Sequence, residues 1–244
     1  MNSTALRRLT VVQFRLQLRE PAVILFGMAL PIALVTLFGL LPSFREHSKD
    51  FGGLRLIDIY VPTLAVLTPA ILALTALPVS LATFREKGVL RRLSASPVPV
   101  AGLLGAQLAV ICVSVAVTSG GVVAIGGLVF GARAPEHPAA AVAALALGSA
   151  ALLGLGLVVA AVAPTAGTAS AAGVPLMILN FFFAGLYVPM QSLPHTLVRI
   201  GEFVPLGAMT ATASGRGSTA EHLAVLACWA LAAGAAAVRF FRWE

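Results

Sequence analysis

The sequence predicts an all-α polytopic membrane protein with six transmembrane helices. Of its 244 residues, 59% are hydrophobic and only 10% are charged, a balance far from that of soluble domains. Six apolar stretches contain no Asp, Glu, Lys, Arg or His and approach the length of about 20 residues that a spanning helix needs. A soluble protein would have to bury six helices that are apolar on every side. The stretches are residues 21–41, 59–83, 103–130, 139–163, 174–190 and 223–238.

The distribution of charge predicts that both termini lie in the cytoplasm. With six spans, the two ends of the chain share one side with the loops 84–102 and 164–173. That side carries 10 of the 16 basic residues and the whole net charge of +7, whereas acids balance bases in the loops of the other side. Excess Lys and Arg marks the cytoplasmic side of a membrane protein. The basic composition therefore indicates topology and no nucleic-acid partner.

Arginine and alanine usage indicates the source of the chain. With 14 arginines against 2 lysines and abundant alanine, the composition is typical of a GC-rich bacterial genome. We therefore expect a multi-pass protein of the bacterial cytoplasmic (inner) membrane, organised as a single transmembrane domain over residues 1–244.

Residues 1–20 precede the first span and predict an interfacial helix at the cytoplasmic surface. Apolar residues recur at helical spacing from Ala5 to Leu16, and Arg15 and Arg19 lie on a neighbouring stripe. This pattern is typical of a helix that lies in the plane of the membrane surface. A plain positively charged anchor for the first span is the alternative.

The densest run of charge is the segment 84–97, with the sequence FREKGVLRRLSASP. Gly88 permits a turn, Leu90 and Leu93 share an apolar face, and Pro97 ends the segment. A loop that only fixes topology needs charge, but it does not need a compact amphipathic turn between Gly and Pro. The segment therefore indicates a docking site for another protein, with a topology-fixing loop as the alternative.

A second informative stretch covers residues 180–215, where three phenylalanines stand in the middle of the fifth apolar stretch. The segment 191–206 that follows is too polar to span a membrane and too apolar for a free loop. It predicts a short re-entrant helix at the external side, since such backbone is tolerated at membrane depth only where protein covers it.

Several classes of function lack their usual residues in this sequence. No cluster of His, Cys and acids has metal-ligand spacing, and no phosphate-binding loop is present, so we expect no catalytic residue, no metal and no ATP bound by the chain itself. The apolar stretches contain no ionisable residue, which argues against an ion-coupled carrier and against a channel with a charged ring.

The segment 84–97 resembles the cytoplasmic signature of the ABC-2 family of transporter permeases. In that family an Arg-Glu-Lys/Arg-Gly run, a Leu-x-x-Leu turn and a Ser/Thr-Pro pair follow the second of six spans. The resemblance implies a coupling helix that seats in a groove of a separate ATP-binding subunit. Val89 and Arg91 depart from the Thr and the acid that are common there. The residues expected to couple to the ATPase are Arg85, Glu86, Lys87, Gly88, Leu90, Arg92, Leu93, Ser96 and Pro97.

The sequence FAGLYVPMQSLP, which begins at Phe183, resembles a second ABC-2 pattern. That pattern is Phe-x-Ser/Ala-Gly followed by Pro and then Leu-Pro, and Ala184 stands here in place of the commoner Ser. In the family it implies an external gate within the re-entrant segment. The gate residues expected from it are Gly185, Pro189, Leu193 and Pro194.

Together the two patterns imply the permease subunit of an ATP-binding cassette exporter, similar to the daunorubicin-resistance type of drug exporter. Two copies of a cytoplasmic ABC ATPase would bind ATP and Mg, and this chain would not be an enzyme by itself. A second permease copy, in a homodimer rather than a heterodimer, would form the path within membrane lipid. The residues expected to line that path are Asn180, Phe181, Phe182, Phe183 and Tyr187.

The cargo that this reasoning favours is an amphipathic drug or a lipid-like molecule, moved outward across the membrane. Export of lipid-linked polysaccharide is an alternative within the same family. A secondary carrier or channel and a membrane scaffold without transport activity are alternatives of another class.

Overall fold

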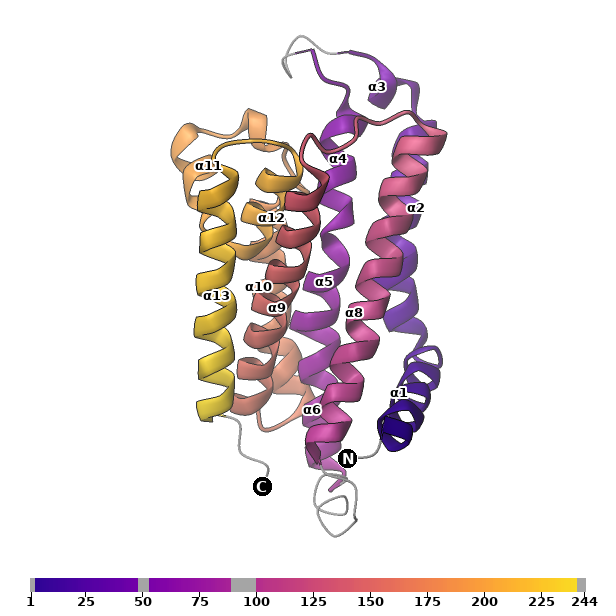
Figure 1. Cartoon of the computed structure of the whole chain (residues 1–244), viewed down its shortest axis with the longest axis vertical. Helices are drawn as coiled ribbons and strands as arrows, with labels where there is room; N and C mark the ends of the chain where they lie inside the picture. The colour runs from indigo at the N-terminus through magenta and orange to yellow at the C-terminus, as the bar shows by residue number, and fades with distance from the viewer. Residues whose placement is uncertain (1–2, 48–52, 89–99, 241–244) are drawn as a thin grey trace.

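The computed structural model of the chain describes residues 3–47, 53–88 and 100–240, which form an upright bundle of helices (Figure 1). Across these ranges the regular structure is entirely helical, apart from an isolated bridge between His47 and Arg55. The predicted all-α fold is therefore confirmed. The helix that begins the chain and the last turn of the helix that ends it lie at the same end of the bundle (Figure 1), called here the terminal end. The opposite end is called the loop end.

Within the described residues, six helices are long and apolar enough to cross a membrane. The first span is formed by η1 (Val23–Ala29) and α2 (Leu30–Leu40), and the third by α8 (Val100–Ala124) and η4 (Ile125–Val129). The second is formed by α4 (Leu56–Ala65), α5 (Leu67–Ile71), η3 (Leu72–Ala76) and α6 (Leu77–Glu86). The fourth, fifth and sixth are α9 (Pro138–Val162), α10 (Ala166–Phe183) and α13 (Thr219–Phe240).

Five shorter elements occupy the two ends of the bundle. At the terminal end, α1 (Ser3–Gln17) packs against α8, and at the loop end α3 (Pro42–Arg45) follows the first span (Figure 1). Between the fifth and sixth spans lie η5 (Met190–Ser192), α11 (His195–Glu202) and α12 (Pro205–Ala213).

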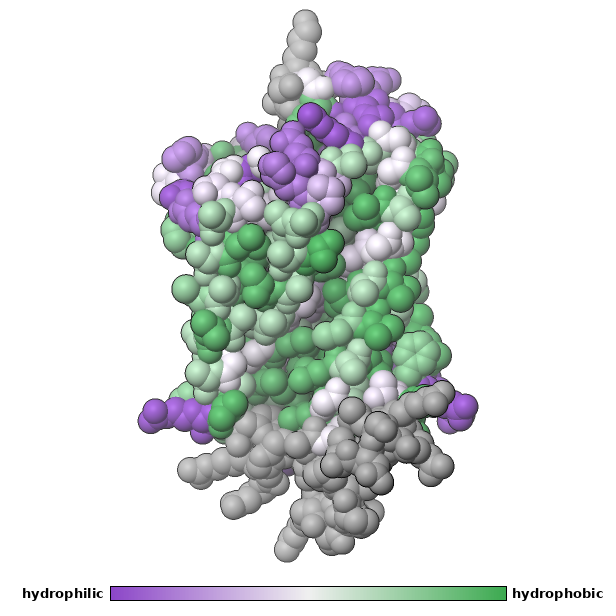
Figure 2. All heavy atoms as spheres, in the orientation of Figure 1, coloured by the Kyte–Doolittle hydropathy of each residue, from purple (hydrophilic) through white to green (hydrophobic). Residues whose placement is uncertain are grey.

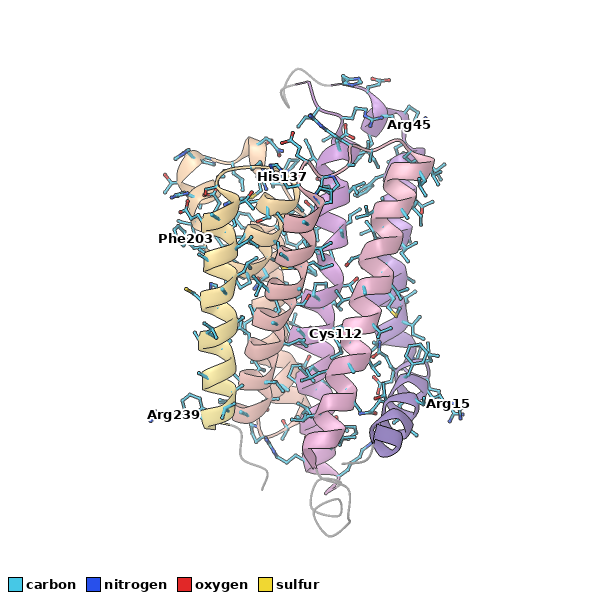
Figure 3. All side chains as sticks on the ribbon, in the orientation of Figure 1. Arg15, Arg45, Cys112, His137, Phe203 and Arg239 are labelled. Carbon is cyan, nitrogen blue, oxygen red and sulfur yellow. The ribbon has the colours of Figure 1, made fainter. Side chains whose placement is uncertain are left out.

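The surface has the apolar belt that a bilayer requires. Figure 2 shows hydrophobic residues around the middle of the visible face and hydrophilic residues gathered at its ends. Among the labelled side chains, Arg15 and Arg239 lie at the terminal end, whereas Arg45 and His137 lie at the loop end (Figure 3). Charges at both ends of an apolar belt fit a multi-pass membrane protein, because charged groups stay out of hydrocarbon.

The second span forms the centre of the bundle. In its most apolar stretch 78% of the residues are buried, against 17% in the sixth span, so the other helices surround it. Pro62, Pro69 and Pro78 fall in α4, α5 and α6, and the chain passes through a π-helical segment, η3, between α5 and α6. Proline removes a backbone donor, and the neighbouring helices that cover this span make the resulting irregularity tolerable at membrane depth.

Two glycines let other spans approach the irregular part of the second span. A Cβ atom added at Gly156 of α9 would overlap the carbonyl oxygen of Ala73, and one added at Gly173 of α10 would overlap that of Leu74. Both carbonyls belong to η3. The backbones of the fourth and fifth spans are therefore in direct contact with the π-helical segment, as small residues permit in membrane bundles.

The fifth span corrects the sequence prediction. We expected a cytoplasmic loop over 164–173 and a span over 174–190, but α10 begins at Ala166 and ends at Phe183. The hydroxyl of Thr165 accepts a hydrogen bond from the backbone N–H of Thr168, so a capping box starts the helix early. At the other end, Gly185 takes a φ of 81°, which a continuing helix does not allow.

Candidate functional site

The charged end of α6 binds the connection between the fourth and fifth spans. The Nη1 atom of Arg85 donates to the carbonyl oxygens of Ala160 at 3.2 Å and Ala163 at 2.9 Å, at the end of α9. The Oε1 atom of Glu86 accepts a hydrogen bond of 3.0 Å from the backbone N–H of Ala166, the first residue of α10. A cation at a helix C-terminus and an anion at a helix N-terminus both complement the helix dipole. The pair therefore holds the ends of three spans together.

The other residues expected to couple to an ATPase are only partly described. Lys87 is exposed and Gly88, with a φ of 63°, follows the end of α6. Leu90, Arg92, Leu93, Ser96 and Pro97 lie outside the described residues. The role of the segment 84–97 in binding an ATPase stays a prediction.

A groove of about 490 Å³ lies between the first, second and fifth spans. Val23 and Phe26 of η1 form one wall, and Val174, Met177 and Phe181 of α10 form the other. Between the two walls the floor is formed by residues of η3 and α6, among them Leu72, Thr75, Val79, Ser80, Thr83 and Phe84.

The residues predicted to line a substrate path lie in different surroundings. Phe181 lines the groove, whereas Asn180 is 4% exposed and forms a hydrogen bond with α12. The Oδ1 atom of Asn180 accepts from the backbone N–H of Leu206 at 3.3 Å, which joins α10 to α12. Phe182 and Phe183 contact each other edge to face, and Tyr187 is 53% exposed beyond the end of α10.

The residues predicted to form an external gate lie between α10 and α11. A Cβ atom at Gly185 would lie 3.0 Å from Cγ of Met190, and Pro189 and Pro194 directly precede η5 and α11. Leu193 is half-buried between these two short helices. The hydroxyl of Thr63 donates to the carbonyl of Ala184 at 3.2 Å, so this turn is anchored to the second span.

The segment after the predicted gate contains a helix that sequence reasoning missed. We expected the re-entrant segment to end at 206, but Pro205 begins α12, whose residues through Thr212 are buried among the spans. Proline at the first helical position was the available signal, since it starts helices as readily as it ends them. The small residues that follow gave no clear periodic pattern.

Charged residues fasten α11 to α13 at the loop end. Arg199 forms ion pairs with Glu202 at 2.8 Å and with Glu221 at 2.7 Å, and the hydrogen bond that it donates to Glu202 contributes most to raising the pKa of Arg199. Burial lowers the pKa of Arg216, and the negative charge of Glu202 opposes this effect. The ion pair of Arg199 with Glu221 therefore links α11 to α13 at the loop end.

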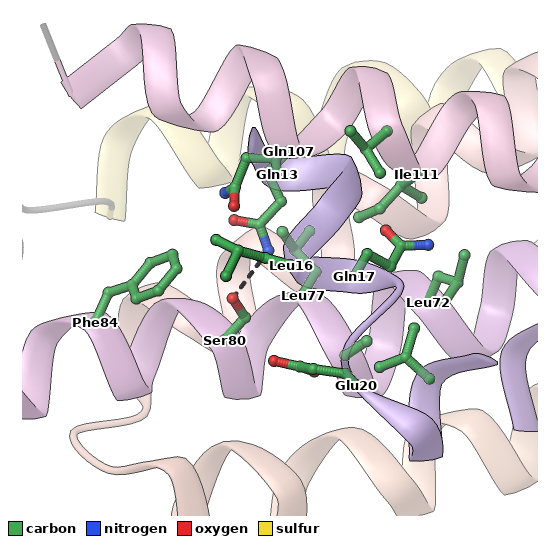
Figure 4. Close-up of a pocket in the computed structure, with 13 residues that line it drawn as sticks. Gln13, Leu16, Gln17, Glu20, Leu72, Leu77, Ser80, Phe84, Gln107 and Ile111 are labelled. Carbon is green, nitrogen blue, oxygen red and sulfur yellow. Dashed lines mark hydrogen bonds between the residues drawn. The ribbon is translucent and has the colours of Figure 1, made fainter. Parts of the chain in front are cut away.

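A second, smaller pocket of about 130 Å³ lies beneath α1, and Figure 4 shows the residues around it. The Nε2 atom of Gln107 donates to the hydroxyl of Ser80 at 3.1 Å, and Nε2 of Gln17 donates to that of Ser114 at 2.7 Å. The pocket collects polar residues from α1, α6 and α8. Sequence reasoning did not bring them together because they lie on segments far apart in the chain.

Among the residues that the structure describes, no group of three or more His, Cys, Asp or Glu side chains is placed to hold a metal ion.

Comparison with protein families matches residues 4–213 to the ABC-2 type transporter. A comparison with curated proteins finds no significant match. The matched range covers the first five spans, the segment 84–97 and the whole stretch from α10 to α12. The permease component of such a transporter is not itself the ATPase. From this match and the six apolar helices, the chain belongs to the ABC-2 type transporter family as a membrane permease.

Proposed function

We propose that the chain is the permease subunit of an exporter, and that an amphipathic drug or a lipid-like molecule crosses the membrane along the groove between the first, second and fifth spans. The observation that carries this proposal is the groove itself, about 490 Å³ in size and walled by η1 and α10. Its lining is mostly aliphatic and aromatic, which suits a cargo with a large apolar part.

The driving force would come from a separate ABC ATPase, in two copies, that binds ATP and Mg at the terminal end. Phe84 lies both in the floor of the groove and at the start of the segment 84–97. Arg85 and Glu86 connect the same end of α6 to α9 and α10. Force applied to the segment would therefore reach both the groove and the neighbouring spans through direct contacts.

A second copy of the permease would close the open side of the groove. Phe26 lines the groove and still exposes 55% of its surface in the single chain. In this proposal the terminal end faces the cytoplasm, in agreement with the excess of basic residues predicted for that side.

The test is reconstitution of the permease with its ATPase in proteoliposomes, with a fluorescent lipophilic dye and a fluorescently labelled phospholipid as probes. Val79→Trp would fill the groove, so we expect ATP-dependent transport to fall at least about tenfold while the ATPase stays bound. Val162→Trp is the matched control, because Val162 is 70% exposed on α9 and lies away from the groove. Transport at the wild-type rate in the Val79 variant would rule out the groove as the path.

A second variant, Leu90→Asp, addresses the coupling segment. We expect it to fold in membranes and to lose the ATPase on co-purification, since a carboxylate would stand on the predicted apolar face. If the variant keeps both its partner and ATP hydrolysis, the segment 84–97 only fixes topology, and the carrier and scaffold alternatives are favoured. Transport of a labelled lipid-linked oligosaccharide in place of both probes would favour the polysaccharide alternative.

A further inference from the structure

The pocket beneath α1 contains a polar atom that lacks a partner. The Oε1 atom of Gln107 is buried and has no hydrogen-bond partner within the described part of the chain. Gln13, which is only 8% exposed, lines the same pocket. In Figure 4 both side chains lie on the same side of the pocket, facing Ser80 and Leu77. An unpaired amide oxygen at this depth is costly unless a hydrogen-bond donor binds to it.

A carboxylate stands at the rim of the same pocket. Glu20 follows α1 at the turn into the first span, and none of the ion pairs among the described residues includes it. Together, Glu20 and the Oε1 atom of Gln107 offer hydrogen-bond acceptors with a net negative charge. The group that complements them is a compact cation with several donors, and a primary ammonium carries three.

The pocket beneath α1 continues into the apolar groove described above. Six residues line both: Glu20, Val23, Leu72, Ala76, Ser80 and Phe84. Glu20 therefore lies where the smaller pocket, with its few polar side chains, meets the larger apolar groove. A molecule with a cationic head and an apolar chain would fill both spaces at once.

We infer that the pocket beneath α1 binds the protonated primary amine of an amphiphile whose apolar part lies in the groove of the first, second and fifth spans. Glu20 supplies the charge, and Gln107 and Gln13 accept hydrogen bonds from the ammonium. The inference rests on the proposed function, because it specifies the head group of the exported molecule. In this inference, Glu20 and Gln107 determine which cargo the permease binds.

The test is photolabelling of the full-length permease in phosphatidylcholine nanodiscs without nucleotide. The probes are dodecylamine and dodecanol, each with a diazirine at the end of the chain, and mass spectrometry maps the labelled residues. We expect half-saturation of labelling at the groove residue Met177 at an amine concentration about tenfold below that of the alcohol, since a charge-assisted contact separates the two heads. Glu20→Gln keeps the shape of the side chain and should abolish this difference.

Two further variants make the result decisive. Gln107→Leu should also weaken labelling by the amine and leave labelling by the alcohol unchanged, whereas Glu46→Gln, an exposed acid at the loop end, should alter neither. Equal half-saturation of the two probes in the wild type would overturn the inference, because the pocket would then not distinguish an ammonium from a hydroxyl. The same holds if Glu20→Gln leaves the preference for the amine intact.

The lipid composition of the nanodiscs distinguishes two sources of the ammonium group, a membrane lipid and a free amphiphile. If phosphatidylethanolamine in the nanodiscs competes with the amine probe in the wild type but not in Glu20→Gln, the natural head group belongs to a membrane lipid. If it does not compete, the amine belongs to a free amphiphile. Because no ATPase or nucleotide is present, failure of this experiment leaves the exporter proposal intact, and failure of nucleotide-driven transport is detected separately.

Discussion

At the scale of single residues, Arg85 and Glu86 have a role that the sequence did not show. The resemblance to the ABC-2 signature places both on the coupling helix, in contact with an ATPase. In the structure their side chains bind backbone groups at the ends of α9 and α10. If Glu86 only contacts the ATPase, its substitution weakens ATPase binding. If its bond to α10 matters, substitution also lowers the stability of the permease alone, so substitution of Glu86 distinguishes the two interpretations.

We predict that Glu86→Ala lowers the stability of the permease even without the ATPase. The variant loses the carboxylate that accepts from the N–H of Ala166, and loss of such a cap costs about 1 kcal/mol. Thermal unfolding of the purified permease in detergent measures the effect. Lys87→Ala is the control, since Lys87 is exposed at the neighbouring position. Equal melting temperatures for the two variants would show that the bond to Ala166 contributes nothing.

At the scale of elements, the contact of α10 with η3 sets the position of the fifth span. A π-helical turn displaces backbone carbonyls from the regular ladder, and such turns are common at functional sites. Here the carbonyl of Leu74 approaches Gly173 so closely that no side chain fits between them. The groove between η1, α6 and α10 therefore has one wall whose position depends on a glycine.

We predict that Gly173→Ala destabilises the permease by about 1–3 kcal/mol, because the added methyl group would force α10 away from η3. Gly120→Ala is the matched control, since a Cβ atom at Gly120 of α8 meets nothing within 4 Å. In the control, the higher helix propensity of alanine should leave stability unchanged or raise it slightly. Urea or thermal unfolding monitored by circular dichroism compares them. A variant of Gly173 as stable as that of Gly120 would contradict the close packing.

At the scale of the whole molecule, the apolar belt and the charged ends define how the chain sits in a bilayer. The terminal end carries Arg15 and Arg239 (Figure 3), and α11, which carries the ion pairs of Arg199, lies at the loop end (Figure 1). Which end faces the cytoplasm follows from the count of basic residues and stays a prediction. This orientation decides whether the end of the groove that Glu20 lines opens toward the inner or the outer leaflet.

We predict that the terminal end is cytoplasmic, and cysteine labelling in intact cells checks this. In a background with Cys112→Ala and Cys228→Ala, Ser43→Cys at the loop end should react with a membrane-impermeant maleimide added from outside. Arg239→Cys should react only after the cells are permeabilised. Both positions are exposed, so accessibility within the protein does not differ between them. The reverse labelling pattern would place the loop end in the cytoplasm.

The sequence alone determined the class of the protein. Composition, six apolar stretches and two charged or aromatic patterns were sufficient, because the bilayer imposes long apolar helices that leave a strong local signal. The boundaries of five of the six spans followed within a few residues. The fifth was displaced, since Thr165 and Gly185 set its ends through a cap and a turn rather than through hydropathy.

Only the tertiary structure decided which residues meet. Three features join segments that are distant in sequence. They are the bonds of Arg85 and Glu86 with the α9–α10 connection, the bond between Asn180 and Leu206, and the pocket shared by Gln13, Ser80 and Gln107. Hydrophobic periodicity reports which face of a helix is apolar, but inside a membrane nearly every face is apolar. Here the close approach of glycines and the pairing of a few polar groups choose the neighbours, and neither is visible before the helices are assembled.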